Sequence, residues 1–173
     1  GHAFGDAVDT QPTDWDHIEV RVDRRVSSPD DLRRLGIQVG DFVALMAGPE
    51  LTHDGFVVSR HLDDQAGVAV ALTLAKHVAD RGLRLPHRTA VMVTIAEEVG
   101  YGASTGLPAG IAEMITVDNA VCAPGLQSRE DAVTVLMADL QGPYDYHLSR
   151  QLCRLADEHG IRRVRDVFRF YRS

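Results

Sequence analysis

One segment constrains the fold of this chain more than any other, because residues 89–95 are almost continuously apolar or β-branched. A strand with this pattern is typically buried on both faces, as the strands of a parallel sheet are. Helix-spaced and strand-like patterns alternate on either side of it. They cover residues 65–80, 114–117, 132–137, 144–159 and 164–170. We therefore predict an α/β fold with a mixed or parallel sheet flanked by helices.

The beginning of the chain has a different character, because its strand-like patterns are short and separated by turn signals. Segments 15–22, 37–47 and 56–58 have strand character, and a short capped helix is expected between the first two. Short strands joined by tight turns favour a small β-barrel or sandwich. We predict a small β-barrel module over residues 1–58, followed by part of an α/β domain over residues 59–173.

The charge and composition exclude several classes of function. The chain has 173 residues and a net charge of −7, with no clustered basic stripe. We therefore expect neither nucleic-acid binding nor attachment to an anionic membrane. No apolar run reaches the roughly 18 to 20 residues that span a bilayer, and no signal-peptide pattern opens the sequence. Since Cys122 and Cys153 are also too few for a disulfide framework, we expect a cytoplasmic protein.

Acidic residues follow three of the strand patterns at the points where the strands should end. Asp63 and Asp64 follow the strand that ends near residue 60, Glu97 and Glu98 follow the run at 89–95, and Asp118 follows 114–117. Ligands collect at the carboxyl ends of strands in open α/β sheets. Carboxylates that converge there repel one another unless a cation offsets their charge. Their joint occurrence therefore favours a site for divalent metal ions.

Each acidic feature also has a simpler interpretation when it is taken alone. Asp63 and Asp64 are suited to cap the following helix and to interact with its dipole. Glu97 and Glu98 fit a solvated first turn. Asp118, next to an asparagine, fits a plain turn.

The same residues carry a resemblance to a known family. Segments 62–69 (LDDQAGVA), 97–100 (EEVG) and 117–118 (VD) resemble the dinuclear metallo-aminopeptidases of the tetrahedral-aminopeptidase and glutamyl-aminopeptidase type, some of which carry the label endoglucanase. Segments 142–148 and 166–173 are similar to a branch found beside genes for an osmoprotectant peptide amide. The β-rich beginning is similar to the small barrel that this family inserts into its catalytic domain. The resemblance therefore covers nearly the whole chain.

The resemblance implies a role for each acidic residue and for two divalent metal ions, zinc or cobalt. Asp63 would bridge the two ions, and in the family its peptide bond to the next residue is commonly cis. Glu98 and Asp118 would be terminal ligands, one on each ion. Glu97 would be the general base that activates a water molecule. The implied activity is hydrolysis of the N-terminal peptide bond of short peptides, and the implied assembly is a homo-oligomer formed through the barrel module.

In this family each metal ion also takes one histidine, and none of the eight histidines here lies in a matching motif. His61 is the strongest substitute, because in an extended segment its side chain would share one face with that of Asp63. It is otherwise a neighbour that orients a ligand, or a surface residue. The resemblance therefore indicates a fragment with part of the site, which we expect to bind divalent metal weakly and to hydrolyse little.

Two other classes of function stay open. One is a catalytically incomplete peptidase-like domain that binds peptides or mediates assembly. The other is a flavodoxin-like cofactor-binding domain, suggested by the glycine-rich segment 100–106 after a strand pattern. That segment lacks the lysine of a phosphate-binding loop and the spacing of a dinucleotide fingerprint, so it is better interpreted as a loop of close approach after Glu97 and Glu98. A charged turn is expected at residues 129–131, and the alternative is a basic residue near a peptide carboxylate.

Overall fold

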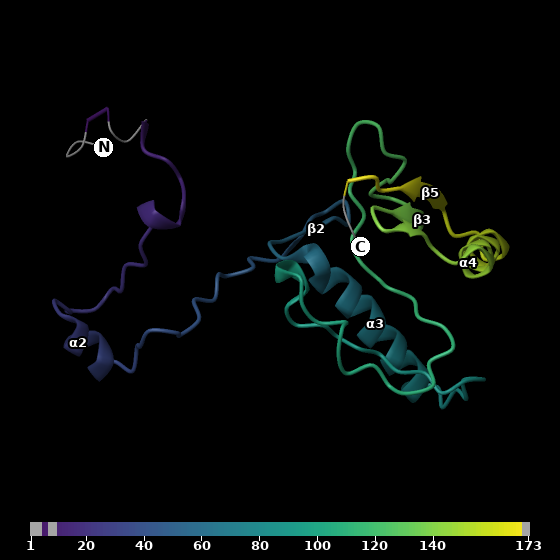
Figure 1. The fold of residues 1–173 in the computed structure, drawn as a ribbon, viewed down its shortest axis with the longest axis horizontal. Coiled ribbons are helices and arrows are strands. Elements are labelled where there is room, and N and C mark those ends of the chain that lie inside the picture. Colours follow the sequence, from purple (N-terminus) through teal and green to yellow (C-terminus); the bar gives the residue numbers. More distant parts are fainter. Residues whose placement is uncertain (1–4, 7–9, 171–173) are drawn as a thin grey trace. The chain divides into compact units, whose positions relative to one another are not determined.

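Figure 1 shows the computed structural model of the chain, which describes residues 5–6 and 10–170. The chain divides into two compact units, residues 1–45 and residues 46–173, called the N-terminal unit and the C-terminal unit below. The C-terminal unit contains helices together with a mixed sheet and an antiparallel hairpin, so the predicted α/β class is confirmed. Within the described residues no helix is long and apolar enough to cross a membrane.

The N-terminal unit contains two short helical elements, the 3₁₀ helix η1 (Trp15–His17) and the α-helix α2 (Pro29–Arg34). Ser28 caps α2, because its hydroxyl accepts a hydrogen bond from the backbone N–H of Asp31 at 3.2 Å. Proline in the first turn and aspartates beside it suit a helix start. This is the short capped helix that the sequence predicts.

No strand occurs among residues 10–45, so the strands predicted at 15–22 and 37–47 are not formed. A strand needs a neighbour whose backbone groups pair with its own N–H and C=O groups, and the described residues of this unit provide none. The side chains of Val39 and Phe42 are accordingly exposed to solvent. A barrel over residues 1–58 is therefore not seen in the described part of the chain.

The C-terminal unit begins with a hairpin that leads into its longest helix. Strands β1 (Glu50–Leu51) and β2 (Val57–Val58) pair antiparallel, with Glu50 opposite Val58. The turn between them is closed by the hydroxyl of Thr52, which accepts a hydrogen bond from the backbone N–H of Phe56 at 3.0 Å. Two residues after β2 the chain reaches His61 and then enters α3 (Leu62–Asp80), which confirms the helix predicted over residues 65–80.

The mixed sheet contains three strands in the order β4-β3-β5, with bounds Gly142–Pro143 for β4, Val133–Asp139 for β3 and Arg163–Val167 for β5. β3 pairs antiparallel with β4 and parallel with β5. The crossover between the two parallel strands is α4 (Tyr146–Glu158), which lies beside β3 and β5 in Figure 1. These elements confirm the strands predicted near 132–137 and 164–170 and the helix predicted near 144–159.

A small core lies between α4 and the sheet. Its buried apolar side chains are those of Val135, Cys153, Ala156 and Phe168. Asp145 caps α4 by accepting a hydrogen bond from the backbone N–H of Leu148 at 2.7 Å. Because the helix presents its small buried residues to the sheet, α4 can approach β3 and β5 closely.

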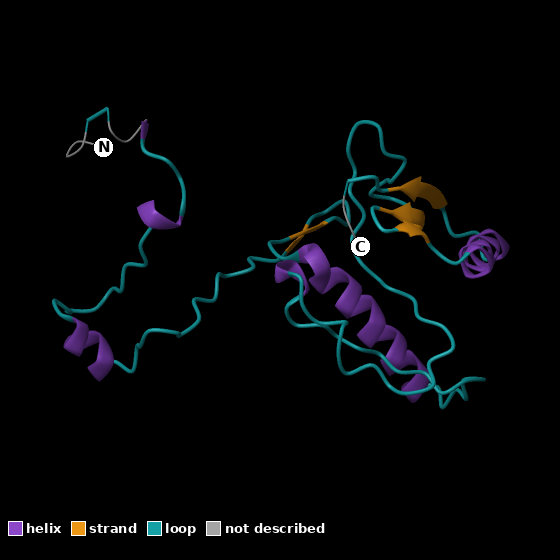
Figure 2. Ribbon diagram, viewed as in Figure 1, coloured by secondary structure: helices purple, strands orange, loops and turns teal. Residues whose placement is uncertain are grey.

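The apolar runs at 89–95 and 114–117 are not strands in this structure and are drawn as loops in Figure 2. The sequence pattern indicates burial, but a strand also requires paired neighbours, and no described segment pairs with either run. Their side chains are correspondingly exposed. Ile95, for example, is 98% exposed. The prediction that 89–95 is a central, doubly buried strand is therefore wrong for this structure.

One buried carboxylate ties the sheet to the loop that precedes it. Asp166 on β5 is only 7% exposed. Its Oδ2 atom accepts hydrogen bonds from the backbone N–H groups of Gln127 at 2.7 Å and Ser128 at 2.9 Å, and from the Ser128 hydroxyl at 3.0 Å. Its Oδ1 atom accepts one from the backbone N–H of Val167 at 2.9 Å. We call this arrangement the Asp166 clamp, and it fixes residues 127–128 to the edge of the core.

Burial alone raises the pKa of the Asp166 carboxyl, but the hydrogen bonds of the clamp outweigh burial and hold the pKa below its usual range. A carboxyl group whose pKa is lower in the folded protein stabilises the fold above its unfolded pKa. That stabilisation is lost as the pH falls through the folded pKa. The clamp should therefore be strong at neutral pH and weaken in acid.

We predict that Asp166→Asn lowers the free energy of unfolding by about 1.5 to 3 kcal/mol at neutral pH, because the charged acceptor is lost and the amide nitrogen would face at least one of the donors that now bind the carboxylate. Chemical denaturation monitored by circular dichroism measures this change. The difference between the variant and the wild type should begin to shrink below about pH 4, and it should be smallest below the lowered pKa of the folded carboxyl, where the wild-type side chain is also neutral. Asp80→Asn is the control, because Asp80 forms only an exposed pair with Lys76. Equal effects of the two substitutions would contradict the clamp.

Candidate functional site

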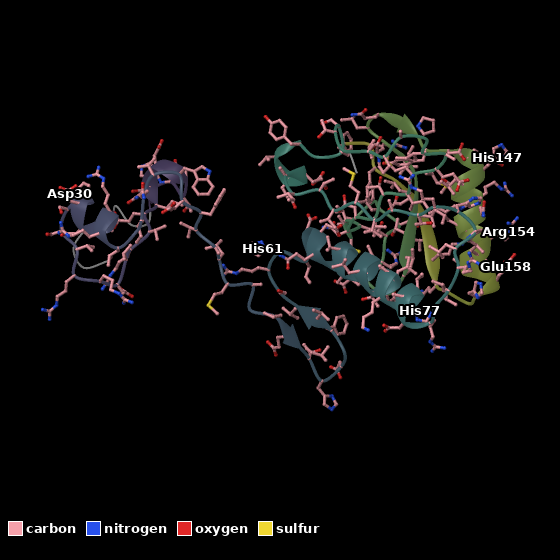
Figure 3. The ribbon with its side chains drawn as sticks, turned by 90° about the horizontal axis from the view of Figure 1, so that it is seen from below. Asp30, His61, His77, His147, Arg154 and Glu158 are labelled. Carbon is pink, nitrogen blue, oxygen red and sulfur yellow. The ribbon has the colours of Figure 1, made fainter. Side chains whose placement is uncertain are left out.

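The first two acidic residues lie at the entrance to α3. His61, just before the helix, has a left-handed backbone with φ of 60°, and the peptide bond between Asp63 and Asp64 is cis. Both aspartates have non-helical backbone angles, so the regular part of α3 begins after them. Figure 3 shows His61 at this end of α3. The cis bond agrees with what the resemblance implies.

Asp64 turns back toward the first turn of the helix. Its Oδ1 atom accepts a hydrogen bond from the backbone N–H of Gly67 at 3.0 Å. Gly67 is buried, and a Cβ atom at this position would lie 2.4 Å from one carboxylate oxygen of Asp64 and 2.5 Å from the other. Only glycine therefore leaves room for the carboxylate in this position.

The pKa of the Asp64 carboxyl is raised above its usual value. Desolvation is the main cause, the negative charges of Asp118 and Asp63 add to it, and the hydrogen bond from Gly67 opposes it. Asp118 is half-buried and comes from a segment far along the chain. Its effect on Asp64 shows that the entrance to α3 and the segment that carries Asp118 lie near one another.

Glu97 begins the 3₁₀ helix η2 (Glu97–Val99), which follows the run at 89–95. Desolvation raises the pKa of its carboxyl, and the charges of Asp118, Glu98, Asp63 and Asp64 raise it further in that order. The acidic residues that the sequence places after three strand patterns thus influence one another in space. The convergence occurs although two of the three expected strands are absent.

The glycine-rich loop after η2 packs closely on the preceding apolar run. Gly102 has φ of 132°, and a Cβ atom at this position would lie 2.8 Å from Cβ of Thr94. Gly100, with φ of 81°, ends η2 in a left-handed conformation. This geometry supports the interpretation of segment 100–106 as a loop of close approach, since both glycines are needed for the chain to turn back on itself.

We call these interacting carboxylates the acidic group; its members are Asp63, Asp64, Glu97, Glu98 and Asp118. Carboxylate oxygens suit hard divalent cations, but the side chains are not arranged as a complete metal site. Among the described residues, no three histidine, cysteine, aspartate or glutamate side chains are placed so that they could hold one ion. Mutual repulsion opposes such a placement, and a bound cation would offset it. The side chains that lie near one another here are all carboxylates. The side chain of His61 is exposed and belongs to no described group that could hold a metal ion.

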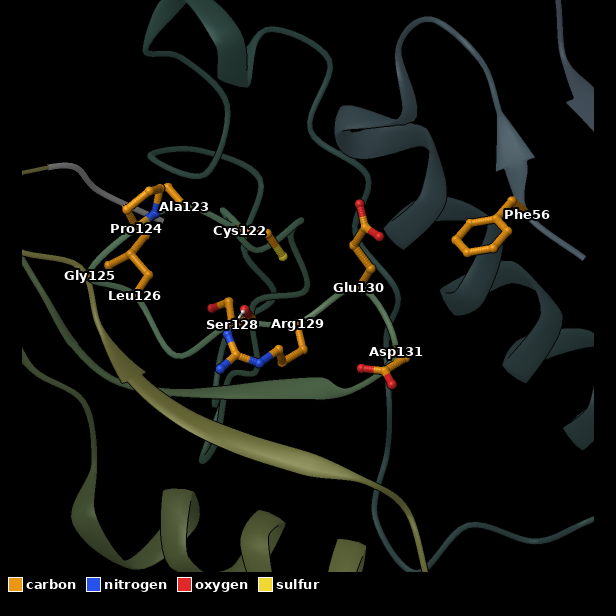
Figure 4. A pocket seen from close by; sticks show the side chains of 10 residues that line it. All are labelled: Phe56, Cys122, Ala123, Pro124, Gly125, Leu126, Ser128, Arg129, Glu130 and Asp131. Carbon is orange, nitrogen blue, oxygen red and sulfur yellow. Dashed lines mark hydrogen bonds between the residues drawn. The ribbon is translucent and has the colours of Figure 1, made fainter. Parts of the chain in front are cut away.

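A second feature, which the motifs did not predict, is a cavity of about 750 Å³. Figure 4 shows its lining, which consists of Phe56 and most of the loop from Cys122 to Asp131. The sequence indicates a charged turn or a carboxylate-binding arginine at residues 129–131, but no cavity. One signal in the sequence was available. Asp166 lies within a strand pattern, and a carboxylate that is buried there needs hydrogen-bond donors. Here the donors come from the loop that lines the cavity.

Comparisons with known proteins agree with the motifs. The family model described as M42 glutamyl aminopeptidase matches residues 1–173. A protein of Bacillus subtilis (strain 168) named "Putative aminopeptidase YhfE" is 35% identical over 172 residues, which are 99% of this chain and 49% of that protein. The chain therefore spans about half the length of this relative.

We predict that Gly67→Ala destabilises the C-terminal unit by about 1 to 3 kcal/mol, because the new methyl group would displace the Asp64 carboxylate. In an Asp64→Ala background the obstacle is gone. There the same substitution should be neutral, or stabilising by up to about 1 kcal/mol, because alanine favours helix. Denaturant unfolding of the four proteins of this cycle measures the coupling. Additive effects of the two substitutions would contradict the contact.

Proposed function

Because the chain belongs to the M42 glutamyl aminopeptidase family, we propose that it takes part in metal-dependent hydrolysis of the N-terminal peptide bond of short peptides. Family membership confirms the resemblance drawn from the sequence and supports a peptidase function. The finer statements are proposals: those about ions and site residues rest on the acidic group near the entrance to α3, and the one about assembly rests on the expected barrel module of residues 1–58.

The observation that carries the proposal is the convergence of carboxylates from three segments. Asp63, Glu98 and Asp118 would supply oxygen ligands to two divalent ions, zinc or cobalt. Such ions, when bound, polarise the scissile carbonyl and make a water molecule more acidic. Ligands from α3, η2 and the segment before Asn119 would approach the ions from different sides, as a shared site requires.

Glu97 would be the general base. It would take a proton from the attacking water and later deliver that proton to the leaving amine. The negative charge of the group also attracts the ammonium of a free peptide N-terminus, which favours exopeptidase action.

The other sequence-based expectations also become proposals. We propose that residues 1–58 form a small barrel module in the assembled protein and that this module supports homo-oligomer formation. We propose a cytoplasmic location, with residues 59–173 as part of the catalytic domain. Pairing of the exposed apolar segments 15–22 and 37–47 with additional strands would supply the neighbours that a barrel needs.

One observation favours a second candidate function. Since no described group of three side chains is ready to hold an ion, the chain would also suit a catalytically incomplete domain that binds peptides or mediates assembly. The two candidates differ in whether the chain hydrolyses peptides and in the role of Glu97.

We predict that calorimetric titration detects zinc binding to the chain and that Asp118→Asn weakens it by about tenfold or more, because a charged ligand is lost. Glu97→Gln should leave zinc binding unchanged. It should lower the zinc-dependent rate of hydrolysis of leucine 4-nitroanilide by about 10²- to 10⁴-fold, because a general base is removed. Glu158→Gln is the control, since Glu158 lies on α4 in an exposed pair with Arg154 (Figure 3).

Two results would decide against this proposal. Loss of zinc binding in Glu97→Gln would make Glu97 a ligand rather than the base. Zinc binding by the wild-type chain without any hydrolysis would favour the catalytically incomplete domain.

A further inference from the structure

We propose that Arg129 binds a peptide carboxylate in the cavity formed by the loop from Cys122 to Asp131. The peptide as ligand rests on the proposed function, whereas the carboxylate recognition rests on the cavity itself. Arg129 would thus be a specificity-determining residue, which neither the motifs nor the comparisons assign.

The position of the cavity along the chain connects it with the acidic group. Phe56, which lines it, belongs to the hairpin that leads into Asp63, and Cys122 follows Asp118 after a short segment. The residues that line the cavity are thus neighbours, along the chain, of two segments that carry proposed metal ligands. Its volume of about 750 Å³ falls within the range of about 300 to 1,000 Å³ that is typical of small-molecule sites.

Arg129 has capacity to bind an anion. Its guanidinium group has five N–H donors, and the hydrogen bond described for it is one donation to the carbonyl oxygen of Ser128 at 3.3 Å. Among the described ion pairs, Asp131 is paired with Arg162, and none involves Arg129. Figure 4 shows the Arg129 side chain extending toward Ser128, away from the side chains of Glu130 and Asp131. A planar guanidinium fork matches a carboxylate with two parallel hydrogen bonds.

The Asp166 clamp holds this arginine in place. Ser128 is 2% exposed, and both its backbone N–H and its hydroxyl donate to Asp166. The backbone at the residue before Arg129 is therefore fixed to β5. A side chain that starts from a fixed backbone loses less conformational freedom when it binds a ligand, so the clamp favours recognition at this position.

A carboxylate in this cavity can come from two parts of a short peptide. One is the C-terminal carboxylate, which would limit the length of the substrate. The other is an acidic side chain near the N-terminus, which would select for sequence. Both sources offer the same carboxylate to Arg129. They can be distinguished with peptides that carry only one of the two carboxylates.

The test uses three peptides whose N-terminus is acetylated, so that none offers a free amine to the acidic group. They are N-acetyl-alanyl-glycine, its C-terminal amide, and N-acetyl-glutamyl-glycinamide. Titration of the ¹⁵N-labelled chain, followed by nuclear magnetic resonance at the amides of residues 122–131, gives each dissociation constant. Because zinc and hydrolysis are not involved, failure here is distinguishable from failure of the proposed peptidase function.

At least one carboxylate peptide should bind roughly 10- to 100-fold more tightly than the uncharged amide, since hydrogen bonds to charged groups contribute about 1.5 to 3 kcal/mol. Arg129→Ala should abolish the difference, and Arg129→Lys should retain part of it because the fork geometry is lost. Arg154→Ala is the matched control, because Arg154 is an exposed arginine on α4. Preference for N-acetyl-alanyl-glycine would identify the C-terminal carboxylate, and preference for the glutamyl peptide the side chain.

Two outcomes would overturn the proposal. One is equal binding of the three peptides by the wild-type chain. The other is a carboxylate preference that survives Arg129→Ala in a variant with an unchanged unfolding midpoint.

Discussion

Repulsion between carboxylates is the constraint on which the proposed site depends. The acidic group comes from three segments of the chain, yet Asp63 and Asp118 raise the pKa of Asp64, and both of them, together with Glu98 and Asp64, raise the pKa of Glu97. Bringing like charges together costs free energy unless a cation is present to offset them. The loops that place these residues are accordingly shaped by glycines at positions of close contact. Gly67 makes room for a carboxylate, and Gly102 lets a loop pack against Thr94.

A second, buried charge supports the other end of the C-terminal unit. The carboxylate of Asp166 is satisfied by hydrogen bonds, so it holds the loop after Asp118 against the small core beneath α4. The acidic group and the clamp therefore have opposite electrostatic characters. Carboxylates are crowded and destabilised in the first, whereas a single carboxylate is stabilised in the second, and the cavity with Arg129 lies along the loop between them.

The elements that the sequence predicted correctly are those whose stability comes largely from local pattern. The periodicity of α3 and α4, the cap at Ser28 and the strand patterns before and after α4 follow from neighbours in the chain. Strands at 89–95 and 114–117 were predicted from apolar runs, but apolar composition does not specify a pairing partner. The convergence of the acidic residues was predicted from their order after strand patterns. The clamp depends on hydrogen bonds between residues 38 and 39 positions apart, and the cavity is lined by Phe56 and by a loop more than 60 residues further along the chain, so no local motif encodes either of them.

A crystal structure of the chain grown with zinc, with an anomalous difference map at the zinc absorption edge, tests the central claim most directly. The account predicts zinc peaks about 2.0 to 2.2 Å from carboxylate oxygens of Asp63, Glu98 and Asp118, with Glu97 nearby but not coordinated. Absence of any zinc peak beside these carboxylates, at a zinc concentration that saturates binding in solution, would contradict it.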